Sequence, residues 1–237
     1  MSSSPIEVTS TTPLSINSRS RADSNATVAV IACGALGPSL NEIVTRRGWS
    51  VDLHQLPALL HNRPTLIAPK VEQLARQLQS RGQTVVVAYA DCGTYGALDA
   101  VCARLNIGRL AGQHCYDVFA KPERIAALLV EEPGTYLLTD FLAKSFRSTV
   151  IKELGLDRYP ELWADYFGNY RRVVWLAQQR TPSLEAEVRG VVERFGLPLV
   201  VMDVGTASLE LELVALLDRA VVMSSQPEQR ARRDRGA

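Results

Sequence analysis

The chain has 237 residues, a formal net charge of +1 and 46% hydrophobic residues, which is enough for one sizeable α/β domain or two small ones. The balanced charge gives no argument for a nucleic-acid partner, and no apolar run approaches the roughly 20 residues needed to cross a membrane. Residues 1–25 contain no apolar signal segment. We therefore expect a disordered leader at 1–25, a disordered tail at 225–237 and a cytoplasmic location.

Between these ends, short apolar runs alternate with amphipathic stretches. The elements predicted from this pattern are, in chain order, strand 27–32, helix 35–48, strand 50–56, helix 64–82, strand 83–90, helix 96–107, strand 108–119, a mostly helical section at 121–169, strand 171–178, helix 183–196, strand 197–204 and helix 208–221. Strands that alternate with helices indicate a parallel sheet with helices on both faces. We therefore predict a single three-layer, Rossmann-like α/β domain over residues 26–224. The section 121–169 is then a helical insertion or cap near the carboxyl ends of the strands.

The cysteines lie at informative places in this pattern. Cys33, Cys92 and Cys115 each lie at or near the end of a predicted strand, whereas Cys102 lies inside a predicted helix beside apolar neighbours. Because the carboxyl ends of parallel strands share one edge of a sheet, where ligands bind in such folds, we expect these three thiols to converge. A cytoplasmic protein rarely forms disulfides, so the thiols are available for metal binding, catalysis or core packing.

Three converging thiolates favour zinc or an iron–sulfur cluster over magnesium or calcium. Three ligands also leave a fourth position open for water or substrate, or leave one iron of a four-iron cluster free to act as a Lewis acid. Two other interpretations stand beside this one. Cys92 is a candidate covalent nucleophile, and buried cysteines also occur as small hydrophobic residues in α/β cores.

Long motifs relate the chain to a known family. They are ACGAL, LHNRP, AYADCGTYGALDAV, GQHCYDVF, EEPGTYLLTDFLAKSF and DYFGNYRRVVWLAQ. Together they resemble the bacterial and archaeal family called domain of unknown function 1638. The resemblance implies no settled activity, but an association of some members with corrinoid and methylamine metabolism implies one-carbon chemistry and a corrinoid protein as a candidate partner. The placement of the cysteines also resembles that in quinolinate synthase, where three thiolates hold a four-iron cluster, which is an analogy between sites.

Several polar residues are predicted at the same edge. His61 and Arg63 follow the second strand, where His61 is a candidate proton donor or ligand and Arg63 a candidate clamp for a carboxylate or phosphate. His114 precedes Cys115 and is a candidate hydrogen-bond donor to a ligand. Thr94 and Tyr95 open a helix whose free amides suit an anion. For all of these, ordinary capping or surface roles are the alternative.

The section 121–169 supplies three further candidates for contact with a substrate, namely Asp140, Lys144 and Asn169. Polar residues of this kind suit a small polar organic molecule. The spacing of Asp140 and Lys144 fits an ion pair on a helix surface equally well.

The sequence thus predicts a metalloenzyme whose ligands are Cys33, Cys92 and Cys115. The first hypothesis is a 4Fe-4S cluster with an open iron that acts on a small polar substrate by elimination or desulfuration, assisted by His61, Arg63 and His114. The alternatives are a zinc–thiolate protein in thiol or methyl transfer, and a non-catalytic metal-binding protein. The helix at 208–221 is a candidate dimer contact.

Overall fold

The computed structural model describes residues 28–233, with side chains as far as Ala220. The predicted leader at 1–25 lies outside the described residues, as do residues 234–237 of the predicted tail. The elements, in chain order, are β1 (Val28–Cys33), α1 (Gly37–Arg47), β2 (Val51–Leu56), η1 (Ala58–Asn62), η2 (Pro64–Leu66), α2 (Ile67–Gln79), β3 (Thr84–Ala88), α3 (Ala97–Leu105), β4 (Gly108–Arg109), α4 (Cys115–Ala120), α5 (Pro122–Glu131), β5 (Thr135–Thr139), α6 (Asp140–Phe146), the π-helical turn η3 (Arg147–Ile151), η4 (Pro160–Leu162), α7 (Trp163–Phe167), β6 (Arg172–Ala177), α8 (Pro182–Phe195), β7 (Leu199–Asp203) and α9 (Ala207–Arg233).

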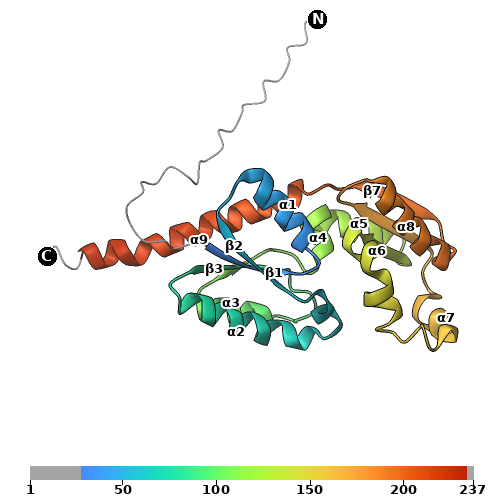
Figure 1. Ribbon diagram of the computed structural model, residues 1–237, viewed down its shortest axis with the longest axis horizontal. Coiled ribbons are helices and arrows are strands. Elements are labelled where there is room, and N and C mark those ends of the chain that lie inside the picture. The colour runs from blue at the N-terminus through green and yellow to red at the C-terminus, as the bar shows by residue number, and fades with distance from the viewer. Residues whose placement is uncertain (1–27, 234–237) are drawn as a thin grey trace, which may run out of the picture.

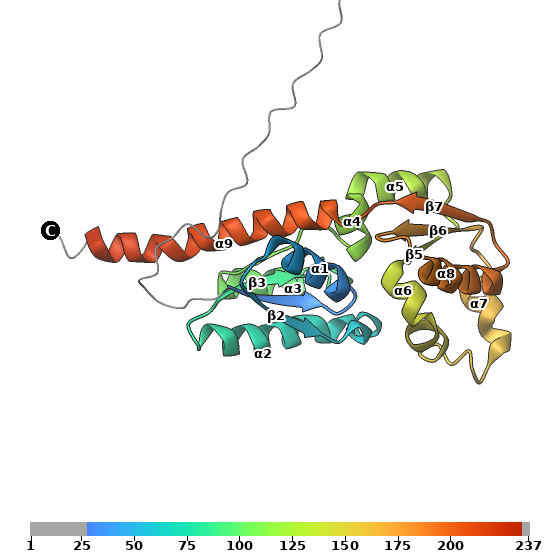
Figure 2. The ribbon, with the colours of Figure 1, turned by 45° about the horizontal axis from the view of Figure 1, so that its top comes forward.

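The described strands form two parallel sheets, which confirms the predicted α/β class. The first sheet has the order β2-β1-β3-β4 and the second has the order β5-β6-β7. Where the sequence predicted one sheet, the structure therefore has two, side by side in both views of the ribbon (Figures 1 and 2).

Strand β5 was not predicted. It lies within the section 121–169, which was expected to be mostly helical. Its sequence, TYLLT, is a short apolar run, and periodicity alone cannot distinguish a five-residue buried strand from part of a buried helix. Helices α5, α6 and α7 do lie in this section. The section is therefore not a purely helical insertion: it contributes a strand to the second sheet.

The strand predicted at 108–119 is the second difference. Only Gly108 and Arg109 pair with β3, and Cys115 is the first residue of helix α4. The Asp117 carboxylate accepts hydrogen bonds from the backbone amides of Gln113 (2.7 Å) and His114 (3.0 Å), and so holds the start of α4. An acidic residue in the first turn of a helix is a helix-start signal, and it overrides the apolar pattern here.

Each sheet has its own hydrophobic core. Around the first sheet, α2 and α3 cover one face and α1 and α9 cover the other (Figure 1), and the strand residues Ile31 and Val86 are fully buried. Around the second sheet, α6 and α8 cover one face and α5 the other (Figure 2). Trp175 of β6 is among the largest fully buried side chains. Both units are thus layered α/β structures.

Helix α9 joins the two units, because it leaves β7 of the second sheet and packs on β3 and β4 of the first (Figure 1). It continues to Arg233 and so includes most of the segment 225–237 that was expected to be disordered. That segment contains several Arg residues together with Gln and Ala, which are good helix formers. In the described part of the chain, none of the helices combines the length and the apolar character that a membrane crossing requires.

Glu210 anchors α9 to α1 and gives a testable pH dependence. Its buried carboxylate binds Arg46 (2.7 Å) and Arg47. Burial alone would raise the pKa of Glu210, but the two guanidinium groups outweigh burial and lower it. We expect Glu210→Gln to lower Tm by about 2–4 °C at pH 7.

Because the folded pKa of Glu210 is depressed, its contribution is present above the unfolded value of about 4.3 and is lost as the pH falls through the folded pKa. Thermal unfolding of both proteins between pH 7 and pH 3 tests this, and the difference should become smaller toward the acid end. Glu212→Gln is the matched control, since no ion pair of Glu212 is present among the described side chains. A difference that is unchanged between pH 7 and pH 3 would contradict the role of the carboxylate charge.

Candidate metal centre

Four elements bring polar side chains to the carboxyl edge of the first sheet. Cys33 is the last residue of β1, Cys92 lies in the loop after β3, and Cys115 begins α4. His61 comes from η1, which follows β2. Gly34 allows this approach, because a Cβ atom there would lie 2.6 Å from the carbonyl oxygen of Leu56. The loop after β1 can therefore lie directly against the start of η1.

The side chains of these residues form a compact cluster. The Cys92 and Cys115 sulfurs are 3.7 Å apart, and His61 Nε2 lies 3.5 Å from Cys115 Sγ and 3.7 Å from Cys33 Sγ. The backbone amide of Ala35 donates to Cys33 Sγ at 3.3 Å, which stabilises a thiolate there. The three thiols predicted to converge do so, and a histidine lies among them.

The orientation of His61 suits a metal ligand. Its Nδ1 lies 2.8 Å from the carbonyl oxygen of Ala58, in the same turn of η1. When Nδ1–H donates to this carbonyl, Nε2 carries the lone pair and faces the sulfurs of Cys33 and Cys115. Histidines that bind metals are oriented in this way by a backbone carbonyl or a carboxylate.

The charges of the cluster are coupled. Hydrogen bonding with Cys115 outweighs burial and, with the help of His61, lowers the pKa of Cys33 well below its ordinary value and that of Cys92 to about 6. Hydrogen bonding with Cys33 and Cys92 keeps the pKa of Cys115 high. Burial alone would lower the pKa of His61, but the thiolates of Cys33 and Cys92 raise it to about 11. The cluster therefore favours negative charge on Cys33 and Cys92 and positive charge on His61.

Tyr89 places a buried hydroxyl group near the cluster. The side chain is fully buried, and its hydroxyl has no hydrogen-bond partner in the described part of the chain. The ring stacks on His61, with centroids 6.3 Å apart and planes 21° apart. Burial, followed by the negative charge of the three cysteines, raises the pKa of Tyr89, which places a protonated hydroxyl beside the thiols.

The backbone at Cys92 is held in an unusual conformation. Its φ is +51°, in the left-handed region that few residues other than Gly, Asn and Asp adopt, and Gly93 follows with φ +82°. The Cys92 amide donates to the carbonyl of Gln113 at 2.7 Å, which ties this loop to the segment before α4. Such conformations concentrate at functional sites, where the surroundings hold the residue in place.

The donor atoms suit one tetrahedral metal ion. Cys33, His61 and Cys115 offer ligand atoms that all lie within 4.8 Å of one another, so this group could hold a metal ion. With metal–ligand bonds of about 2.0–2.3 Å, tetrahedral ligand atoms lie about 3.3–3.8 Å apart. The measured separations of 3.5 and 3.7 Å match these values. Cys92 is not part of this group but lies next to Cys115.

A cavity of ≈ 220 Å³ adjoins the cluster and is lined by His61 and Cys115. It lies between the two units, because its other walls come from α4, β5, α6 and η3. Asn62 Nδ2 donates to the carbonyl of Thr149 at 3.4 Å and so links η1 to η3 beside the cavity. A molecule in this cavity would reach Cys115 and His61 directly.

Four of the polar residues predicted near the thiols are not brought into the cluster. Arg63 and His114 are exposed, and neither lines the cavity. The Thr94 hydroxyl is buried and donates to Asp91 at 2.6 Å, which makes it part of the helix start at α3. Tyr95 is 96% exposed. Burial alone would raise the pKa of Asp91, but the hydrogen bonds from Thr94 and from the amides of Gly96 and Tyr95 lower it.

The three candidates from the section 121–169 also lie outside the cavity lining. Asp140 is buried and accepts hydrogen bonds from Trp175 Nε1 (2.8 Å) and from the amides of Gln178 (3.2 Å) and Gln179 (2.8 Å). Lys144 is exposed on α6. Asn169 precedes β6 and is therefore at the amino edge of the second sheet, because β6 runs away from it.

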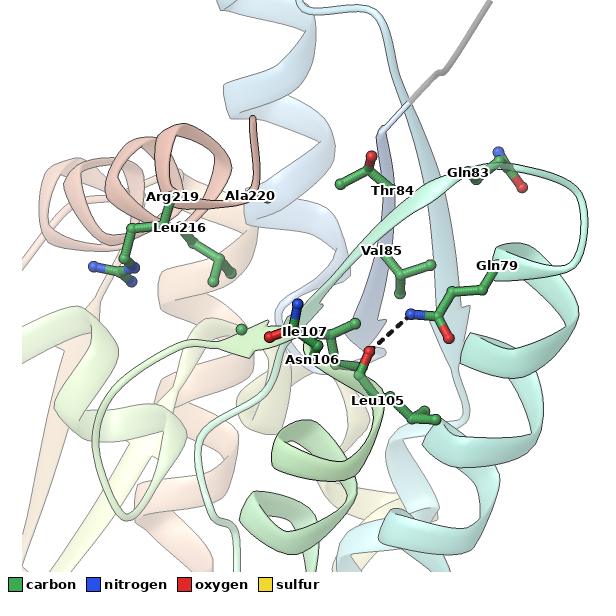
Figure 3. Close-up of a pocket in the computed structure, with 11 residues that line it drawn as sticks. Gln79, Gln83, Thr84, Val85, Leu105, Asn106, Ile107, Leu216, Arg219 and Ala220 are labelled. Carbon is green, nitrogen blue, oxygen red and sulfur yellow. Dashed lines mark hydrogen bonds between the residues drawn. The ribbon is translucent and has the colours of Figure 1, made fainter. Parts of the chain in front are cut away.

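A larger cavity lies elsewhere and carries little chemistry. It has a volume of ≈ 350 Å³ and lies at the amino ends of β3 and β4, under α9 (Figure 3). Its polar contacts include the hydrogen bond from Gln79 to the carbonyl of Leu105, at 3.0 Å. Arg219 is the one ionisable side chain that lines it in the described part of the chain. Size alone therefore does not identify the functional site.

Sequence reasoning missed three tyrosines. Tyr89 directly follows β3, and Tyr116 and Tyr136 line the cavity. The signal for Tyr89 is a phenol at the end of a strongly apolar run, and Tyr116 directly follows a candidate ligand in the motif HCYD. Tyr136 had no such signal, because its strand was not predicted.

Comparison with known proteins gives one match. The family model described as "Protein of unknown function (DUF1638)" matches residues 55–213, which confirms the predicted resemblance and includes His61, Cys92 and Cys115. No curated protein and no solved structure matches the chain.

Proposed function

The chain belongs to the DUF1638 family, and because the description of that family assigns no activity, we propose a function from the geometry of its thiol cluster. We propose that Cys33, His61 and Cys115 bind a single zinc ion, which would lower the pKa of a small thiol that enters from the adjoining cavity, so that the thiol would lose its proton to water. This is the activation step of thiol-transfer chemistry. The observation that carries the proposal is the group of three ligand atoms, all within 4.8 Å of one another, beside a cavity that two of these residues line.

The donor set supports zinc with an open position. Two thiolates and one imidazole are ligands that catalytic zinc sites use, and such sites leave the fourth position to water or substrate. When bound, the ion would supply Lewis acidity, which deprotonates a coordinating thiol at neutral pH. The chain itself would orient His61 through Ala58, stabilise the Cys33 thiolate through the Ala35 amide, and offer the Tyr89 hydroxyl as a hydrogen-bond donor to sulfur.

The spacing of the sulfurs favours this proposal over a 4Fe-4S cluster. In a four-iron cluster each cysteine binds a different iron, so the sulfurs must lie farther apart than the ligands of one ion. The ligand atoms of Cys33, His61 and Cys115 all lie within 4.8 Å of one another, which is close enough for a single ion. A non-catalytic zinc centre would differ from the proposed one only at the fourth coordination position. Cys92 would occupy that position and close the coordination sphere.

Metal analysis of matched variants tests the proposal. The full chain is purified without oxygen, and zinc, iron and acid-labile sulfide are measured for the wild type and for Cys33→Ser, Cys92→Ser and Cys102→Ser. Cys102 is the control, because it is buried on α3 and has no hydrogen bond to the cluster. We expect one zinc ion per chain in the wild type, Cys92→Ser and Cys102→Ser, and loss of zinc in Cys33→Ser.

Each other outcome identifies a different function. Iron and sulfide in similar amounts would replace the proposal with the cluster hypothesis. Loss of zinc in Cys92→Ser would indicate a closed, non-catalytic centre. Absence of bound metal after reconstitution would leave Cys92 as the candidate nucleophile.

A further inference from the structure

The cavity walls are electrically neutral outside the cluster. Apart from His61, Cys115 and the two tyrosines, no ionisable side chain lines the cavity in the described part of the chain. Arg63 and Lys144 are exposed and lie outside the lining. A carboxylate or phosphate held against the walls away from the cluster would lose its hydration without gaining a cationic partner there, which is strongly unfavourable.

The polar groups of the walls are mostly used within the chain. The Thr139 hydroxyl accepts a hydrogen bond from the Leu142 amide at 3.2 Å, and the Thr149 hydroxyl donates to the Ser145 carbonyl at 2.9 Å. The rest of the lining is largely aliphatic and aromatic, with side chains such as Leu36 and Phe119. These walls therefore favour an apolar molecular body.

Two tyrosines supply the remaining polarity. Tyr116 and Tyr136 line the cavity, and no hydrogen bond of either hydroxyl to a described residue is present. A phenol has an ordinary pKa of about 10, so both hydroxyls are neutral near pH 7. They can donate to or accept from a neutral polar group, but they cannot balance a full charge.

The volume limits the size of the molecule. An engineered apolar cavity of about 150 Å³ holds benzene, and the same proportion leaves room for about nine non-hydrogen atoms here. The volume of ≈ 220 Å³ therefore accommodates a substituted benzene or a short alkyl chain, and anything larger would have to extend out of the cavity.

From these walls, this volume and the thiolate-rich cluster at one end, we infer that the substrate is a compact, uncharged organic thiol whose sulfur is directed at Cys115 and His61. This inference rests on the proposed function and specifies its substrate class. It replaces the expectation of a polar substrate held through an anionic group by Arg63, Thr94 and Tyr95, because none of these three residues lines the cavity.

A pair of thiols that differ in one charge tests the inference. Phenylmethanethiol and 4-(mercaptomethyl)benzoate are titrated into the full chain loaded with Co²⁺, and binding is read from the change in cobalt absorption when a new sulfur ligand joins. We expect the neutral thiol to bind at least about tenfold more tightly, because the carboxylate must be desolvated without a partner. Equal or tighter binding of the carboxylate would overturn the inference.

A variant that fills the cavity provides the second readout. Leu142→Trp places a large ring in the lining and should abolish the response to phenylmethanethiol while one Co²⁺ per chain is retained. Leu129→Trp is the control, because Leu129 is exposed on α5 and away from the cavity lining. An unchanged response in Leu142→Trp would overturn the assignment of the cavity.

Failure of the proposed function can be distinguished from failure of this inference. If the chain binds no metal, the proposed function fails, and the same two thiols are compared by thermal unfolding of the metal-free chain. A rise in Tm with the neutral thiol alone supports the neutral cavity, because a ligand that binds the folded state stabilises it. A rise with the carboxylate, or with neither thiol, overturns the inference.

Discussion

Replacing Cys115 with serine should lower the affinity of the chain for Co²⁺ or Zn²⁺ at least about 100-fold. Cys115 is the central residue of the cluster, since its sulfur lies 3.7 Å from Cys92 Sγ and 3.5 Å from His61 Nε2. A serine hydroxyl keeps the size of the side chain but is a harder and much less acidic ligand, so it binds these ions poorly. Competition titration against a chromophoric chelator, with the full chain purified without oxygen, measures the two affinities.

Three controls accompany this measurement. Cys102→Ser should leave the affinity unchanged, because Cys102 lies on α3 outside the cluster. His61→Ala should weaken binding by a similar factor to Cys115→Ser, since it removes the one nitrogen ligand. The far-ultraviolet circular dichroism of all variants should match that of the wild type. An affinity of Cys115→Ser within a factor of about three of the wild type would contradict the metal centre as described.

Asp140→Ala should lower the free energy of unfolding by about 3 kcal/mol. The carboxylate accepts hydrogen bonds from the Trp175 indole and from the amides of Gln178 and Gln179, all of them buried or partly buried. Alanine leaves these three donors without a partner. The substitution therefore acts on the free energy of unfolding through lost buried hydrogen bonds, and not through a lost contact with substrate. Urea unfolding at pH 7 measures the difference, with Lys144→Ala as the exposed control on the same helix.

The pH dependence of Asp140 has the opposite sign to that of Glu210. Burial raises the pKa of Asp140, and the hydrogen bonds only partly offset it. Because the folded pKa lies above the unfolded value of about 3.9, ionisation is less favourable in the fold, so this group removes stability as the pH rises from the unfolded pKa through the folded one. Asp140→Asn cannot ionise and should lack that loss. Parallel urea curves for Asp140→Asn and the wild type between pH 3 and pH 7 would contradict the raised pKa.

The fold class followed from local sequence because the signals are local. An apolar run such as 83–90, followed by an amphipathic stretch, predicts a strand and a covering helix wherever it occurs. Parallel strands joined by helices then place all their carboxyl ends on one edge, which is why the convergence of Cys33, Cys92 and Cys115 could be predicted. Strand β5 could not be predicted in this way, because a five-residue run is too short to show a periodicity.

The division into two sheets could not be predicted from such local sequence signals. Nothing in the strand at 171–178 distinguishes a partner in the first sheet from β5, since any buried parallel strand presents the same apolar surface. Strand pairing is decided by packing between elements that are distant in the sequence. The walls of the cavity depend on this division, because they come from both units.

The sequence by itself determined the parallel α/β class, the family and the three cysteines that follow strands. Only the tertiary structure decided which polar residues join those thiols: His61 lies among them, whereas Arg63, two residues later, is exposed. Likewise it assigned Asp140 to a buried hydrogen-bond network and Tyr136 to the cavity. The physical reason is that a strand end determines where a backbone emerges, whereas the direction of a side chain in the following loop or turn depends on contacts with distant segments, such as Gly34 against Leu56 and Asn62 against Thr149.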